Sequence, residues 1–126
     1  MVLVTDEPIN PATAYDLIGC DNAGSVLFHY AVVKANNDPR RETTSIDYLP
    51  NGDVRAELDS IAADLKEKWS LTEVLLVRRT GRLGVGDIIS LVAAGSANSV
   101  DAFAACQYGI ERLKKMSTIK KQEAFR

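Results

Sequence analysis

The sequence predicts an α+β protein, with a mixed or antiparallel sheet and helices packed on it. Two long stretches repeat apolar residues with the period of a helix, and four short stretches are rich in Val, Ile, Leu and aromatic residues, as strands are. With a short N-terminal helix, the order is helix, strand, strand, helix, strand, strand, helix, which is typical of the α+β class. At 126 residues, the chain is expected to form one domain spanning residues 1–126.

Composition places the chain among ordinary globular proteins. It is 46% hydrophobic and 25% charged, unlike the polar, highly charged sequences of disordered chains. No apolar run approaches the roughly 20 residues that span a bilayer, and the N-terminus MVLVTDEP lacks the features of a signal peptide. We therefore expect a cytoplasmic protein with no membrane association.

The N-terminal third is expected to hold one helix and two strands. From Thr5 to Gly19 an extended entry leads into a short helix, bracketed by prolines and ended by the glycine. Ser25 to Lys34 suits a buried strand, Ala35 to Arg41 an exposed loop, and Thr43 to Leu49 a second strand.

The first long helix begins after the turn Pro50-Asn51-Gly52, with Asp53 as its N-cap. Its apolar residues recur at steps of three and four, which indicates a face buried in the core rather than a cofactor site. These residues are Val54, Leu58, Ile61, Leu65 and Trp69.

Two more strands and a second long helix follow. Glu73 to Arg79 and Ile88 to Gly95 are predicted strands, joined by the glycine-rich connection Thr80 to Asp87. This connection is not a phosphate-binding P-loop, because a strand follows it and GK[ST] is missing. The last helix is expected from Ser99 to Lys115, capped by Asn98 or Ser99.

Common catalytic patterns are missing from the chain. It has no Ser-His-Asp set, no catalytic pair of carboxylates and no nucleotide fingerprint. Cys20 and Cys106 lack metal-ligand spacing, and with His29 as the single histidine we expect neither a metal site nor a bound cofactor. Both cysteines are interpreted as small core residues.

Basic residues are concentrated in two places. Residues 112–126 carry six basic side chains and one acidic one, for a charge of +5 within a chain of net charge −2. A second group is Arg78, Arg79 and Arg82. These charges fit either a solvated surface or an anion-binding pocket, in which lysines could bind phosphate or transfer protons.

Three spaced motifs resemble the large, catalytic subunit of molybdopterin synthase. They are VLLVRRTGRLGVGD, VAAGSANSVDAFAACQYGIERLKK and IKKQE, similar to the family runs V-x-x-x-H-R-x-G-x-L-x-x-G-[DE], V-x-x-x-S-x-H-R-x-x-A-F-x-A-C and K-x-E. EPINPATAYDLI and the strand from Ser25 also fit, so the resemblance covers nearly the whole chain.

The resemblance implies a transferase with an α/β hammerhead fold that makes the dithiolene of molybdopterin from cyclic pyranopterin monophosphate. Its sulfur donor would be the C-terminal Gly-Gly thiocarboxylate of a small ubiquitin-like subunit. Large subunits of the family form a homodimer, which with two small subunits makes a heterotetramer. Neither nucleic acid nor a membrane is an expected partner.

The resemblance also assigns roles to residues. Lys114 matches the lysine of the family L-K motif and Lys121 the lysine before x-E, so both are predicted to be catalytic. Lys114 would contact the thiocarboxylate carbonyl or act as general acid/base, while Lys121 would hold substrate and stabilise negative charge. Arg79 matches the family arginine and is predicted to support the substrate pocket.

Departures from the family motifs fall on the anion-binding positions. Asn98-Ser99 stands where the family has His-Arg, Arg78 replaces a histidine, and Lys34 replaces an arginine. Together with Lys120, these residues are predicted to bind substrate, and Lys34, Arg78 or Lys120 would compensate for the missing arginine. The alternative is a non-catalytic paralogue that binds a protein or another ligand. A nucleic-acid role is less favoured, because the basic tail has only Phe125 for stacking and the pI is 5.4.

Overall fold

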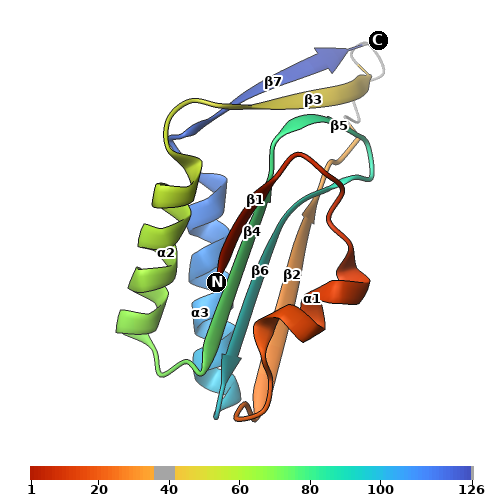
Figure 1. Ribbon diagram of the computed structural model, residues 1–126. Helices are drawn as coiled ribbons and strands as arrows, with labels where there is room; N and C mark the ends of the chain where they lie inside the picture. The colour runs from red at the N-terminus through yellow and green to blue at the C-terminus, as the bar shows by residue number, and fades with distance from the viewer. Residues whose placement is uncertain (36–41, 126) are drawn as a thin grey trace.

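Two sheets and three helices make up residues 1–35 and 42–125, the part of the chain that the computed structural model describes (Figure 1). No helix in this part is both long and apolar enough to cross a membrane. In chain order the elements are β1 (Val2–Thr5), α1 (Pro11–Ile18), β2 (Ser25–Val32), β3 (Thr43–Pro50), α2 (Val54–Lys68), β4 (Glu73–Arg79), β5 (Gly81–Gly84), β6 (Ile88–Ser96), α3 (Ser99–Lys114) and β7 (Ile119–Phe125).

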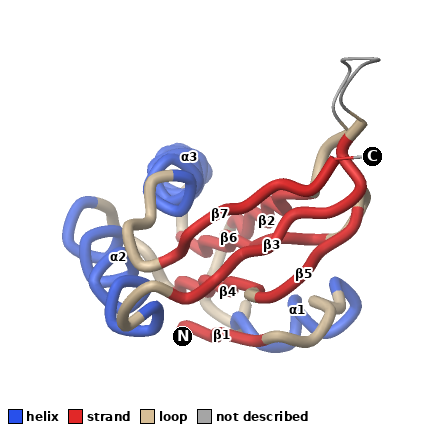
Figure 2. Tube along the Cα trace, turned by 90° about the horizontal axis from the view of Figure 1, so that it is seen from above, coloured by secondary structure: helices blue, strands red, loops and turns tan. Residues whose placement is uncertain are grey.

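The larger sheet has the strand order β1-β4-β6-β2. β1 runs parallel to β4, while β4 with β6 and β6 with β2 are antiparallel, so the sheet is mixed as predicted. The smaller sheet, β5-β3-β7, is antiparallel and lies across one end of the larger one (Figures 1 and 2). This arrangement confirms the predicted α+β class.

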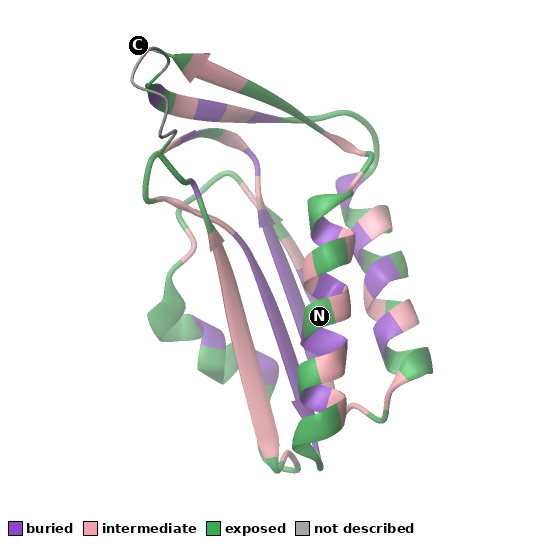
Figure 3. Cartoon of the chain, turned by 180° about the vertical axis from the view of Figure 1, so that it is seen from behind, coloured by how far each residue is buried: buried purple, intermediate pink, exposed green. Residues whose placement is uncertain are grey.

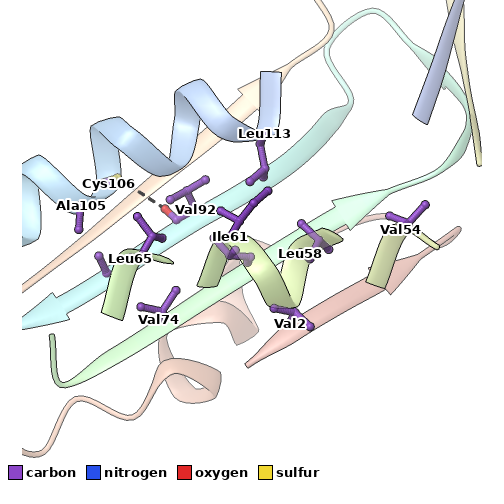
Figure 4. Packing of buried hydrophobic residues seen from close by; sticks show 12 residues of the cluster. Val2, Val54, Leu58, Ile61, Leu65, Val74, Val92, Ala105, Cys106 and Leu113 are labelled. Atoms are coloured by element: carbon purple, nitrogen blue, oxygen red, sulfur yellow. Dashed lines mark hydrogen bonds between the residues drawn. The ribbon is translucent and has the colours of Figure 1, made fainter. Parts of the chain in front are cut away.

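Helices cover both faces of the larger sheet, because its central strands are apolar on both sides. Figures 2 and 3 show α2 and α3 on one face of this sheet and α1 on the other. In β4, Val74 and Leu76 pack with α2 and α3, whereas Leu75 and Val77 face α1, following the period of two of a strand. Figure 4 shows the hydrophobic core between this sheet and the helices α2 and α3. The predicted stripe of α2 supplies it with the buried residues Val54, Leu58, Ile61 and Leu65, and Trp69 packs at its margin.

The two cysteines, which were interpreted as core residues, differ in how far they are buried. Cys106 is 4% exposed and contacts the Val92 carbonyl through its sulfur (Figure 4), and burial raises the pKa of its thiol. Cys20 is only half-buried, against the core under α1.

Three strands were not predicted from the sequence. β1 ends at Thr5, where the expected extended entry begins, β5 lies within the expected connection Thr80 to Asp87, and β7 falls in the basic tail. Each is short or polar, so its strand character comes from pairing with β4 or β3 rather than from its own pattern. Most of the expected loop Ala35 to Arg41 lies outside the described residues.

The predicted cap of α2 gives a stability test. The Asp53 carboxylate accepts a hydrogen bond from the Ala56 amide at 2.9 Å. We expect Asp53→Ala to lower the free energy of unfolding by about 1 kcal/mol, measured by urea denaturation. As a control, Asp59→Ala removes an exposed carboxylate from the middle of the same helix and should cost nothing. Equal losses in the two variants would contradict a capping role.

Candidate active site

A cavity of about 300 Å³ lies where the two sheets meet the C-terminal end of α3. Its lining comes from six elements and combines an apolar surface with polar and basic side chains. The polar and basic members are His29 of β2, Tyr48 of β3, Arg78 of β4, Ser90 of β6, Lys114 of α3 and Lys121 of β7. Three residues predicted from the sequence, Arg78, Lys114 and Lys121, therefore line one cavity.

Arg78 is the buried cation of this cavity. It lies near the end of β4 on the same face as Val74 and Leu76, and only 7% of the residue is exposed. Its guanidinium carbon lies 4.8 Å from the centre of the Tyr48 ring, a cation–π contact. Burial lowers the pKa of Arg78, with the charge interaction with Tyr48 acting against it.

The Nε atom of Arg78 is buried and has no hydrogen-bond partner among the described residues. A buried N–H of a charged group is costly to leave unpaired, so such a group is typically satisfied by a ligand or water. The cavity therefore offers a guanidinium donor to an anionic ligand.

Lys114 and Lys121 approach the cavity from either side of one turn. Lys114 is the last residue of α3, and Lys121 is the third residue of β7, where it is the cross-strand partner of Tyr48. Both side chains are exposed, so they can reach a ligand without first being uncovered. The short segment between α3 and β7 thus places both lysines on the lining of one cavity.

The other predicted site residues do not line this cavity. Arg79 is the neighbour of Arg78 on a strand and so points to the opposite face, where it lies 3.8 Å from the Asp87 carboxylate. Lys120 is likewise adjacent to Lys121 in β7, and Lys34 is exposed two residues beyond β2. The basic group Arg78, Arg79 and Arg82 is thus split, since Arg82 pairs with Asp47 on the smaller sheet.

Asn98 and Ser99 lie at the other end of α3 from Lys114. Lys114 lies fifteen positions after Ser99 along the helix, about 22 Å at the usual rise per residue. The Asn98 side chain caps the helix, accepting from the Asp101 amide at 2.8 Å, as predicted. Ser99 borders a second, largely apolar hollow between α3 and β2, which shares His29 and Ile110 with the first cavity.

His29, Tyr48 and Ser90 line the cavity but were not singled out as site residues from the sequence. A weak signal for His29 exists, because Leu27, His29 and Ala31 alternate along β2 and so share the face toward α3. Tyr48 follows Ile46 in the same way along β3. Neither alternation indicates which end of the strand meets a pocket.

Comparison with known proteins shows the family. A model of the family described as "MoaE protein" matches residues 4–116. The chain belongs to this family. The molybdopterin synthase catalytic subunit of Cereibacter sphaeroides is 30% identical over 105 residues, 83% of this chain and 70% of the relative. The corresponding subunit of a Nostoc species is 45% identical over 64 residues, which cover 50% of this chain and only 39% of the relative.

Solved structures of the MoaE family share the fold. Molybdopterin synthase from Staphylococcus aureus superposes with a TM-score of 0.89 at 27% identity, covering 98% of this chain and 90% of that one. A complex of subunits 1 and 2 of molybdopterin-converting factor from Helicobacter pylori gives 0.79 at 13% identity, which shows likeness of fold alone. The family resemblance and the hammerhead-like fold predicted from the sequence motifs are confirmed.

Proposed function

We propose that this MoaE-family chain is the catalytic subunit of a molybdopterin synthase. It would transfer sulfur from a small-subunit thiocarboxylate to cyclic pyranopterin monophosphate and so form the molybdopterin dithiolene. The observation that carries the proposal is the convergence on one cavity of Lys114, Lys121 and Arg78, whose Nε has no hydrogen-bond partner among the described residues. The relatives in the family named molybdopterin synthase catalytic subunits support it.

The three cations suit the groups that the reaction brings together. Lys114 would donate a hydrogen bond to the thiocarboxylate carbonyl or act as general acid/base, and Lys121 would stabilise negative charge that develops on the substrate. Arg78 is buried and its guanidinium has several donors in one plane. It would bind the phosphate of the pterin substrate or the thiocarboxylate of the small subunit. Arg79, Lys34, Lys120, Asn98 and Ser99 remain predicted substrate-binding residues whose contribution activity assays would test.

The proposed partners follow from the same chemistry. A C-terminal Gly-Gly has no side chains, so it can enter a cavity of about 300 Å³ as an extended tail. The H. pylori protein of similar fold was solved as a complex of subunits 1 and 2 of molybdopterin-converting factor. We propose that this chain likewise binds a small ubiquitin-like sulfur carrier, as a homodimer within a heterotetramer in the cytoplasm.

A non-catalytic paralogue is the second candidate. It is favoured by the residues that stand in this chain where the family has His-Arg. Asn98 is engaged in capping α3, and Ser99 carries no charge, so neither offers a titratable or cationic group. A neighbouring gene for a small ubiquitin-like protein ending in Gly-Gly would favour the enzyme. A partner without that ending would favour the paralogue.

The test is direct reconstitution. Purified chain is incubated with cyclic pyranopterin monophosphate and the thiocarboxylated cognate small subunit, and dithiolene product is measured. We expect product only when the thiocarboxylate is present, with the unmodified small subunit as control. A folded complex with the cognate subunit that makes no product would overturn the proposal and favour the paralogue.

A further inference from the structure

The carboxylate of Glu57, in the first turn of α2, holds the turn between α3 and β7. It accepts hydrogen bonds from the Ser117 amide at 3.1 Å, the Thr118 amide at 3.0 Å and the Thr118 hydroxyl at 2.6 Å. The Asn51 amide also donates to the Thr118 carbonyl at 2.6 Å. Glu57 in α2 thus binds the Ser117 and Thr118 amides, and Asn51, just before that helix, binds the Thr118 carbonyl.

The turn joins the two predicted catalytic lysines. Lys114 ends α3, residues 115–118 form the connection, and Lys121 follows two residues after β7 begins. Met116 and Ile119, on either side of the residues that Glu57 binds, line the same cavity as the lysines. The conformation of this turn sets the direction in which β7 leaves α3. It therefore also sets the separation of the Lys114 and Lys121 side chains.

Glu57 itself is not among the residues that line the cavity. Partial burial would raise the pKa of its carboxyl, but the hydrogen bonds from Thr118 and Ser117 outweigh this effect and lower the pKa. The group is therefore charged at neutral pH, and its three bonds are of the stronger, charge-assisted kind. Any influence on a ligand must pass through the turn.

We propose that Glu57 is a positioning residue, which sets the spacing of Lys114 and Lys121 and thereby the ability of the cavity to bind an anionic ligand. The inference deepens the proposed function, on which it rests for the identity of the working lysines. Its anion-binding part can be tested without any sulfur transfer. Sequence reasoning did not find Glu57, because α2 and the turn meet only in the folded chain.

The experiment compares Glu57→Ala and Glu57→Gln with wild type. Inorganic pyrophosphate is titrated into ¹⁵N-labelled protein, and the shifts of the Ser117 and Thr118 amides report the hydrogen bonds to Glu57. Turnover is measured separately as kcat and KM. We expect Glu57→Ala to bind pyrophosphate about tenfold more weakly and to lose about 10- to 100-fold in kcat, since a displacement of about 1 Å has effects of that size. Glu57→Gln keeps one acceptor oxygen, so its pyrophosphate affinity and kcat should lie between those of Glu57→Ala and wild type.

Asp64→Ala is the matched control. Asp64 lies on the same helix and also ties α2 to α3, through an ion pair with Arg112, but neither residue lines the cavity. Its loss should leave pyrophosphate affinity and kcat within about twofold of wild type. Wild-type affinity in both Glu57 variants would overturn the inference, as would an equal loss in Asp64→Ala, which would indicate general loosening.

The two proposals fail in different ways. Absence of dithiolene product with normal, Glu57-dependent pyrophosphate binding would overturn the synthase function and leave the positioning role intact. Should Glu57→Ala prove unfolded, the comparison of Glu57→Gln with wild type decides, because the isosteric amide removes the charge while keeping the shape of the side chain.

Discussion

Replacing Lys114 or Lys121 by alanine is expected to lower the rate of dithiolene formation about 10²- to 10³-fold. This is the usual effect of removing a proton-transfer group or a group that stabilises developing charge. Both side chains are exposed and belong to no core cluster, so the melting temperature should stay within about 2 °C of wild type. The measurement is initial rate in the reconstituted reaction, paired with thermal unfolding.

Lys115→Ala is the matched control for these variants. Lys115 is exposed and adjacent to Lys114, but it does not line the cavity. Its loss should leave the rate nearly unchanged. A similar loss in all three variants would mean that the overall positive charge of this region, rather than two placed ammonium groups, supports the reaction. Near-normal rates without Lys114 or without Lys121 would remove that lysine from the mechanism.

Arg78→Met is expected to raise KM for the phosphate-bearing substrate by about 10- to 100-fold. A hydrogen bond to a charged group is worth about 1.5–3 kcal/mol, which corresponds to that range. Methionine keeps an apolar stem against Tyr48 but removes every donor. Steady-state kinetics over a range of substrate concentrations would measure the change.

The free energy of unfolding of Arg78→Met distinguishes a binding role of Arg78 from a structural one. Because Arg78 is buried with an unpaired Nε, its charge is costly to the folded protein, and Arg78→Met should be as stable as wild type or more so. Arg78→Lys tests geometry, since it restores a charge but lacks the planar fork. A loss of several kcal/mol in Arg78→Met with an unchanged KM would assign Arg78 to the fold alone.

The sequence alone was sufficient for the long elements and the family. The stripe from Val54 to Leu65 predicted the buried face of α2, because a period of three and four residues can satisfy only a helix packed on one side. Asp53 and Asn98 were identifiable as caps, since that interaction is local. The spaced motifs led to the MoaE family and selected Lys114 and Lys121.

Only the tertiary structure decided which members of each basic group face the cavity. Arg78 and Arg79 are neighbours in sequence, as are Lys120 and Lys121, yet adjacent residues of a strand point to opposite faces. Which face is turned inward depends on the register of β4 and β7 with their partners, and β7 is a strand only because β3 pairs with it. The place of Tyr48 on the cavity lining and the bonds of Glu57 to the turn after α3 are also set by the tertiary structure. Both depend on contacts between segments far apart in the chain, which local sequence patterns do not encode.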